Sequence, residues 1–409
     1  MTVTAFTNAR IFDGIAPEYT RDSCVVVEDS RIVEVAPHYS HFSGAAVIDL
    51  RGRTLMPGLI DAHCHVMGSS LKVAEIEASP LTYVTSHAAK VLRGALAAGF
   101  TSVRDLAGAD IGIARAVEEG LIEGPRVFFA GRALSMTGGH GDMRDPFHAI
   151  GTCACGQAGR LTTIVDGPDS VRRAARDEFH RGAHCIKLML SGGVLSPSDP
   201  IWMDQFTDSE VLAAVEEAAR WRSYVAAHCH PASSIERAAK LGIRSIEHAT
   251  MIDEISARAV AASNAFVVPT LIIVRALRDS GKAMGLPSWA NEKLAAIGET
   301  AMHSLEIMER SGLKIGFGTD LLGALWSRQT EEFLLRREVQ SASAILRSAT
   351  SINADLMNQP EVGRIAVGCL ADLLVVDGDP LDNISLLAAG GRHLRAVMKG
   401  GRFYKASFD

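Results

Sequence analysis

The stretch "MPGLIDAHCHV", residues 56–66, places two histidines two positions apart at the end of an apolar run. Side chains alternate between the two faces of a strand, so His63 and His65 are expected to point to one face and Cys64 to the other. Imidazole is a ligand for Zn, Fe, Ni and Cu, so this pattern indicates either a divalent metal site or a pair of structural histidines. Which of the two applies depends on whether other strands end in further ligands.

The middle of the chain alternates short β-branched or apolar runs with longer helical stretches, which is typical of a parallel sheet built from βα units. The runs are "GLIDAHCHV" (58–66), "FTSVRDL" (100–106), "RVFFAG" (126–131), "CIKLML" (185–190), "YVAAHC" (224–229), "SIEHA" (245–249), "FVVPTL" (266–271) and "KIGFGTD" (314–320). Eight strands in a segment of roughly 300 residues favour a (β/α)8 TIM barrel over an open doubly wound sheet. We therefore predict an α/β protein whose largest domain is such a barrel.

Both ends of the chain carry short β-rich runs separated by turn residues. Residues 2–56 include "SCVVVEDSRIVEVA", while "GCLADLLVVDGDPL" and "RAVMKGGRFYK" follow residue 358. Runs of this kind form hairpins and small sheets. We predict that residues 1–56 and 359–409 together form a small β-sandwich domain, which brackets a hydrolase barrel of residues 57–358.

The composition is that of an ordinary globular protein, with 409 residues of which 47% are hydrophobic and 22% charged. A formal net charge of −6 without a long basic run argues against partners such as nucleic acid or an anionic membrane surface. The N-terminus lacks the basic and apolar regions of a signal peptide, and no stretch approaches the roughly 18 apolar residues of a membrane span. We therefore expect a cytoplasmic protein.

Seven cysteines without a CxxC spacing fit a reducing compartment better than a disulfide framework. Cys153 and Cys155 form one close pair, within the long irregular stretch of residues 132–166. A loop of that length in a compact domain is usually functional. A metal or redox role is one interpretation of the two thiols, and ordinary loop thiols are the other.

Barrel enzymes place their chemistry at the C-terminal ends of the strands. The residues that the predicted strands carry at or near those ends are His63, His65, Lys187, His228, His248 and Asp320. All of them except the lysine are good metal ligands as they stand. The pattern therefore favours a metal centre over a set of structural histidines.

Lys187 lies within an apolar run, where an ammonium group has no lone pair and its burial costs free energy unless it is paired. A structural salt bridge is one explanation. The other hypothesis is that the amine loses its proton and takes up CO2. The resulting carbamate would have two oxygens that can bridge two divalent cations.

The segments "PGLIDAHCHV", "CIKLML", "AAHC", "IEHA", "GFGTD" and "GCLADLLVVDGDPL" resemble the amidohydrolase superfamily over nearly the whole chain. More narrowly, they resemble its prolidase-like and Xaa-amino-acid dipeptidase branch, which also includes ochratoxin-type amidases. The resemblance implies a homo-oligomer with a binuclear metal centre, usually of zinc. It assigns the ligands by motif position: to one ion His63, His65 and Asp320, to the other His228 and His248, and to both the carboxylated Lys187.

The resemblance also implies a mechanism. Two cations about 3.5–4 Å apart share a water and lower its pKa, so that hydroxide is the implied nucleophile. Asp320, which would touch both metal and water, is the implied base that hands a proton to the departing amine.

Four further residues are candidates for contacts with the substrate. His140, in "TGGHGD", resembles a histidine in the same loop of family members and is expected to donate a hydrogen bond to the developing oxyanion. His230 stands where Xaa-Pro-cleaving relatives carry a tyrosine, which leaves proline specificity open; it either binds a substrate carboxylate or packs. Arg328 offers a bidentate fork for a carboxylate, and Trp326 is either a pocket wall or a core or interface residue.

Together, the motifs and the resemblance indicate a metal-dependent amidohydrolase. Its expected small-molecule substrate is an amide of a C-terminal amino acid, either a dipeptide such as Xaa-Pro or Xaa-Xaa or an N-acyl amino acid. The alternative is hydrolysis of a cyclic amide, a carbamate or an imidazolone-type substrate. A non-catalytic scaffold is disfavoured, because it need not retain the full set of strand-end residues that this chain carries.

Overall fold

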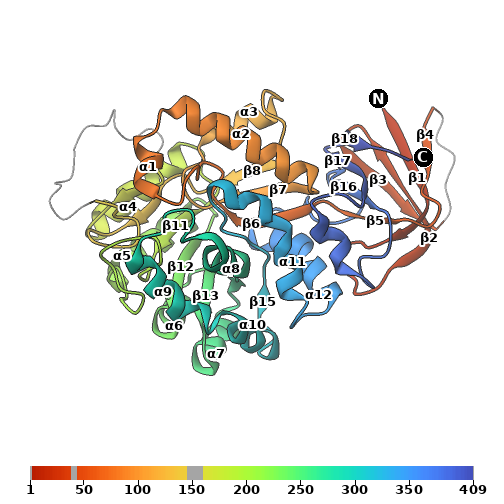
Figure 1. Ribbon diagram of the computed structural model, residues 1–409. Coiled ribbons are helices and arrows are strands. Elements are labelled where there is room, and N and C mark those ends of the chain that lie inside the picture. The colour runs from red at the N-terminus through yellow and green to blue at the C-terminus, as the bar shows by residue number, and fades with distance from the viewer. Residues whose placement is uncertain (1, 38–43, 145–159, 409) are drawn as a thin grey trace.

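The computed structural model describes residues 2–37, 44–144 and 160–408. The chain forms a group of parallel strands surrounded by helices and, at one side, a sheet built from both chain ends (Figure 1). Cys153 and Cys155 lie outside the described residues, so their predicted role is not tested.

Each of the eight predicted runs contains a strand of the barrel. These strands are β6 (Leu59–Cys64), β7 (Phe100–Asp105), β8 (Arg126–Phe129), β11 (Ile186–Met189), β12 (Val225–Pro231), β13 (Ser245–Met251), β14 (Phe266–Val268) and β15 (Lys314–Ile315). They pair in parallel, in one ladder from β6 to β8 and another from β11 to β15. Two short strands, β9 (Ala133–Ser135) and β10 (Thr162–Ile164), extend the second ladder beyond β11.

Backbone hydrogen bonds join the two ladders at both seams. At one seam the amide of Ala62 donates to the carbonyl of Phe317, and the amide of Asp320 donates to the carbonyl of His63, each at 2.8 Å. At the other seam the amide of His184 donates to the carbonyl of Phe129 at 2.8 Å. The first and last strands therefore lie side by side, as the predicted barrel requires.

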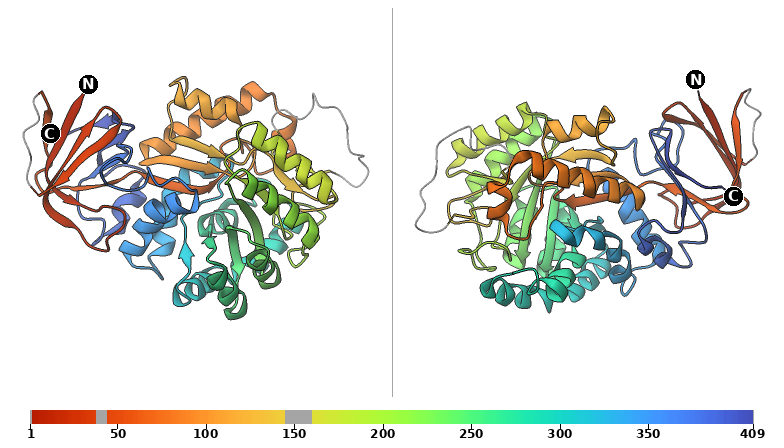
Figure 2. Two further views of the ribbon diagram at one scale, coloured as in Figure 1. Left: turned by 180° about the vertical axis from the view of Figure 1, so that it is seen from behind. Right: turned by 45° about the horizontal axis from the view of Figure 1, so that its top comes forward.

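Helices connect successive strands and lie on the outside of the barrel (Figure 2). They are α1 (Val73–Ala78), α2 (Leu81–Ala97), α3 (Ile111–Glu118), α4 (Pro168–His180), α5 (Asp208–Arg220), α6 (Ala232–Lys240), α7 (Glu254–Ser263), α8 (Leu271–Ser280), α9 (Ser288–Gly298), α10 (Ala301–Arg310), α11 (Glu332–Arg336), α12 (Ala342–Arg347) and α13 (Asn353–Leu356). Among the described residues, no helix has both the length and the apolar character needed to cross a membrane.

Strands from both chain ends form one continuous sheet, in the order β18-β17-β16-β5-β1-β2-β3, with β4 paired to β1. Their bounds are β1 (Val3–Ile11), β2 (Thr20–Glu28), β3 (Arg31–Ala36), β4 (Ala46–Asp49), β5 (Thr54–Pro57), β16 (Leu373–Val376), β17 (Leu394–Lys399) and β18 (Arg402–Ala406). Phe6 of β1 contacts Phe403 of β18, with ring centroids 6.2 Å apart, although other strands separate them in the sheet. The sheet therefore curves around a shared apolar cluster. Its two halves face each other across this cluster like the two layers of the predicted sandwich, although they belong to one hydrogen-bonded sheet.

Asn353, at the start of α13, joins the first and last barrel strands through its buried side chain. Its Nδ2 donates to the carbonyls of Ile60 and Phe317, each at 2.8 Å, and its Oδ1 accepts from the amide of Phe317 at 3.0 Å. One amide group thus satisfies three backbone groups at the seam that leads to His63 and Asp320.

We expect Asn353→Ala to lower the midpoint of thermal unfolding, because the buried amide of Phe317 loses its acceptor, at a cost of about 1–3 kcal/mol, and two carbonyls each lose one donor. Calorimetry measures the midpoint. Asn291→Ala is the matched control, since it removes an exposed side-chain bond to Pro287, and it should change stability by less than about 0.5 kcal/mol. Equal midpoints for the two variants would contradict the proposed role of Asn353.

Candidate metal centre

All six predicted strand-end residues line one cavity of the barrel. One oxygen of Asp320 lies 3.3 Å from Nε2 of His63 and 3.0 Å from Nε2 of His65. One donor atom of each of these three residues lies within 4.8 Å of the other two, which is close enough to share a metal ion. This trio is the set that the sequence motifs assign to the first ion.

The imidazoles of His228 and His248 form a second group beside the first. Their ring centroids are 4.6 Å apart, and the ring of His248 is 4.7 Å from the ring of His63. The second oxygen of Asp320 is 4.0 Å from Nδ1 of His248. The residues expected to hold two ions are therefore neighbours, and Asp320 lies between the two groups.

Lys187, on β11, is 1% exposed. Within the described parts of the chain its amine forms no hydrogen bond or ion pair, so the structural salt bridge is not observed. Burial lowers the pKa of this amine below its ordinary value, although Glu247 and Asp320 oppose the shift. Within those parts of the chain Lys187 therefore has no hydrogen-bonded counter-ion, an unfavourable setting for a structural cation.

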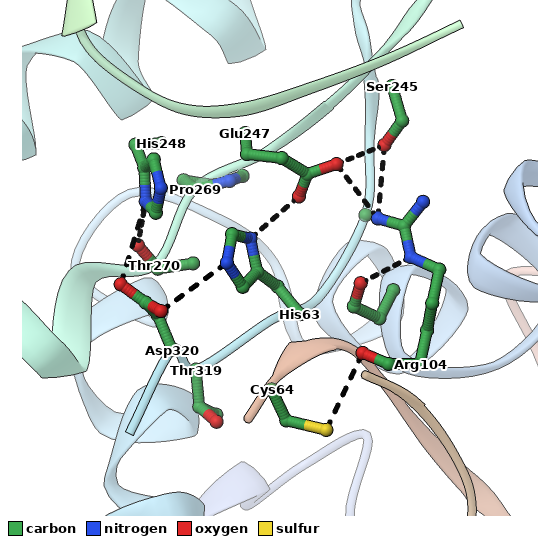
Figure 3. A network of polar contacts seen from close by, with 12 residues as sticks. His63, Cys64, Arg104, Ser245, Glu247, His248, Pro269, Thr270, Thr319 and Asp320 are labelled. Atoms are coloured by element: carbon green, nitrogen blue, oxygen red, sulfur yellow. Dashed lines mark hydrogen bonds and ion pairs between the residues drawn. The ribbon is translucent and has the colours of Figure 1, made fainter. Parts of the chain in front are cut away.

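Left-handed backbone brings two of the site residues into position. The φ angles are 67° at His248, 47° at Ala249 and 56° at Asp320, values that are uncommon outside glycine and cost about 1–3 kcal/mol each. The turn at His248 interrupts the alternation of β13. As a result Glu247 and His248, which are adjacent in the sequence, both contact His63 (Figure 3).

Glu247 is part of the site although the sequence analysis did not single it out. Its buried carboxylate accepts a hydrogen bond from Nδ1 of His63 at 2.8 Å and another from the guanidinium of Arg104 at 2.9 Å (Figure 3). Burial would raise the pKa of this carboxyl group, but Arg104 and His63 hold it at about 2. Because Nδ1 of His63 donates to an ionised carboxylate, the orientation of the ring is fixed and its Nε2 faces the site.

A sequence signal for this network exists. "FTSVRDL" and "SIEHA" are strand runs that contain a charged residue, and charged residues on buried strands must be paired. The signal predicts that Arg104 and Glu247 need partners. It does not predict that they pair with each other.

His140 and His230 also line the cavity. The ring of His140 stacks on His228 with centroids 4.2 Å apart, and its Nδ1 lies 2.6 Å from the hydroxyl of Ser196. Nδ1 of His230 is hydrogen-bonded to the hydroxyl of Thr250 at 2.8 Å. Burial and the neighbouring His140 lower the pKa of His230 to about 3, so its ring is neutral near pH 7.

Arg328 does not line the cavity. It lies in the 3-10 helix η2 (Gly323–Glu331), and its guanidinium is 2.9 Å from Asp279 and 2.7 Å from Glu331. The expectation that Arg328 clamps a substrate carboxylate is therefore corrected, because two carboxylates of the chain already pair it. Trp326 of the same helix is 7% exposed and packs in the main apolar core, so of its two interpretations the core residue applies.

The remaining wall of the cavity is largely apolar. Ile273, Val274 and Leu277 of α8 and Leu294 and Ile297 of α9 contribute to it. Among the described lining residues Lys187 is the one lysine, and none is an arginine. The cavity therefore combines a polar, histidine-rich floor with apolar sides.

Comparison with known proteins identifies the family. Residues 54–403 match the model of the Amidohydrolase family. The chain is 32% identical over 369 residues to ochratoxinase of Aspergillus niger, which covers 86% of this chain and 75% of that protein. The chain belongs to the amidohydrolase family.

Two solved structures resemble the chain over nearly its full length. One is a prolidase complexed with N-methylphosphonate-L-proline, at 40% identity and a TM-score of 0.96, covering 99% of this chain and 100% of that one. The other is a Xaa-Pro dipeptidase with bound methionine, at 28% identity and a TM-score of 0.88, again covering 99% and 100%. The structural neighbours are thus prolidase-like and dipeptidase-like amidohydrolases.

Glu247→Gln should weaken zinc binding by about 10- to 100-fold, because the neutral amide no longer orients and polarises His63. It should also lower stability, because Arg104 is left as an unpaired buried charge. Competition with a chelator of known affinity measures the zinc affinity of each variant.

Glu332→Gln is the matched control for this substitution. Glu332 is also fully buried and lies 2.8 Å from a buried arginine, Arg336, but its other oxygen bonds the amide of Ile272 rather than a histidine. This variant should lose stability and keep its zinc affinity. Equal losses of zinc affinity in both variants would contradict a specific role for Glu247.

Proposed function

We propose that the chain is a metal-dependent amidohydrolase that cleaves the amide bond to a C-terminal amino acid, in a dipeptide or an N-acyl amino acid. The observation that carries this proposal is the convergence of four imidazoles, Asp320 and the buried Lys187 on the floor of a largely apolar cavity. The resemblance to a prolidase and to a Xaa-Pro dipeptidase supports the same class of bond.

Two divalent ions, with zinc as the expected element, belong to this proposal. The residues that would hold them are His63, His65 and Asp320 for one ion, His228 and His248 for the other, and Lys187, as a carbamate, for both. Imidazole and carboxylate donors suit zinc, and a buried amine without a counter-ion gains from becoming an anion between two cations. Bound there, the ions would polarise an amide carbonyl and lower the pKa of a shared water.

Asp320 is the proposed proton carrier. Its carboxylate lies between the two groups of imidazoles, where it can accept the proton of the attacking water. As the bond between carbonyl carbon and nitrogen breaks, the same group delivers that proton to the departing nitrogen. The products are then a carboxylic acid and a free amino acid.

His140 and His230 are proposed to contact the substrate. His140 uses Nδ1 for Ser196, which leaves Nε2 to donate toward the carbonyl oxygen as negative charge develops there. His230 uses Nδ1 for Thr250, so its Nε2 is the atom available to the substrate. Because His230 is neutral, it offers a substrate carboxylate a hydrogen bond rather than an ion pair.

The walls from α8 and α9 favour a substrate whose acyl part, or whose side chain on the acyl side of the bond, is apolar.

One observation favours the alternative of an uncharged cyclic amide or carbamate. Apart from Lys187, the described lining residues include no lysine or arginine that would pair with a substrate carboxylate.

The test is amine release by zinc-reconstituted protein, with bicarbonate present, across N-acyl amino acids, Xaa-Pro and other dipeptides, cyclic amides and carbamates. We expect turnover of substrates with a free C-terminal carboxylate, faster with apolar acyl groups. Chelation should abolish the activity, and zinc with bicarbonate should restore more of it than zinc alone. Turnover confined to uncharged amides would select the alternative, and full activity in metal-free protein would refute both.

Asp320→Asn should lower turnover by about 100- to 10 000-fold, because an amide cannot carry the proton. The fold should remain, which circular dichroism verifies. Asp279→Asn is the control, since it removes a carboxylate that pairs with Arg275 and Arg328 away from the cavity lining. Unchanged turnover in Asp320→Asn would require another proton carrier.

A further inference from the structure

The ring of His140 is held from several sides. It stacks on His228, and its backbone amide donates to the side-chain oxygen of Gln205 at 3.0 Å. On another side it lies against Gly193, where a Cβ atom would come within 2.0 Å of the ring carbon Cε1. Glycine is thus required at 193 by the close approach of this ring.

A buried carboxylate lies behind the ring. Nδ1 of His140 is 2.6 Å from the hydroxyl of Ser196 and 3.5 Å from the carboxylate of Asp199, and neither Ser196 nor Asp199 is exposed. The hydroxyl of Ser196 also lies 3.5 Å from the carbonyl of Gly193. Ser196, Gly193 and the carboxylate of Asp199 therefore surround the Nδ1 edge of the ring.

Asp199 is itself fixed by the loop that follows β11. The amide of Gly193 donates to its Oδ2 at 3.0 Å, and the side-chain amide of Gln205 donates to the same oxygen at 3.3 Å. Gly193 and Gln205, which both bond Asp199, also contact His140 from other sides. The carboxylate and the ring therefore share one rigid support.

Lys293 of α9 ties this loop to the apolar wall. Its ammonium group donates to the carbonyls of Gly193 at 2.9 Å, Ser196 at 2.7 Å and Asp199, and lies 3.4 Å from Oδ1 of Asp199. Lys293 directly precedes Leu294, which lines the cavity. One cation thus connects the support of His140 to the helix that contacts the substrate's apolar part.

We propose that Asp199 and Lys293 are positioning residues that hold His140 with Nδ1 toward Ser196 and Nε2 toward the substrate's carbonyl oxygen. The interaction of Nε2 with the substrate rests on the proposed function, whereas the positioning of the ring does not. Ser196 and Asp199 both lie at the Nδ1 edge of the ring, so Nε2 is the ring nitrogen that faces the cavity. Lys293 keeps the loop, and with it Asp199, at the distance that this arrangement needs.

The first test does not depend on activity. In zinc-loaded protein with ¹⁵N-labelled histidine, NMR should show a ring nitrogen signal that disappears in His140→Gln, which assigns it to His140. The signal should shift or be lost in Asp199→Asn and in Lys293→Met. It should be unchanged in the controls Asp110→Asn, which alters a helix N-cap, and Lys282→Met, on the surface. An unchanged His140 signal in Asp199→Asn and in Lys293→Met overturns the proposal.

The second test is a double-mutant cycle on a substrate that the wild type hydrolyses. Asp199→Asn should lower kcat by about 10- to 100-fold with little change in KM, as expected for a contact made mainly in the transition state. In a His140→Gln background the same substitution should change kcat by less than about 3-fold. Independent, multiplicative losses would overturn the proposal. Absence of turnover in the wild type would instead refute the proposed function, while the NMR result would still decide on the positioning of His140.

Discussion

The site depends on one buried charge, the carboxylate of Glu247. A charge inside a barrel is tolerated only when it is paired and hydrogen-bonded, because its desolvation is otherwise too costly. Arg104 and His63 satisfy it, and Arg104 is in turn fixed by the carbonyl of Ala62 at 2.6 Å and the hydroxyl of Ser245 at 3.1 Å. The network therefore connects β6, β7 and β13 and sets the orientation of the His63 ring at the same time.

The same coupling of fold and site recurs at the barrel seam. Asp320 has left-handed backbone, a conformation that costs free energy, and its amide donates to the carbonyl of His63 across the seam. The side chain of Asn353 stabilises this seam by hydrogen bonds to the carbonyls of Ile60 and Phe317. The strained residue is thus held by bonds that the barrel must form in any case, which places its carboxylate between the two groups of imidazoles.

Different elements of the barrel supply the different parts of the cavity. The strand ends supply the candidate metal ligands, α8 and α9 supply the apolar wall, and the loop after β11 contacts His140. Lys293 of α9 donates hydrogen bonds to carbonyls of the loop after β11. The apolar wall and the loop that contacts His140 are therefore joined by hydrogen bonds.

The sequence by itself determined the eight barrel strands and the six residues that they bring to one cavity. It could do so because strand alternation is a local property, and because the C-terminal ends of parallel strands meet at one face of a barrel. Only the tertiary structure decided which charges pair: Arg328 with Asp279, 49 residues away, and Arg104 with Glu247. It also decided that Glu247 and His248 both reach His63, because left-handed backbone at His248 breaks the two-residue period on which the sequence argument rests.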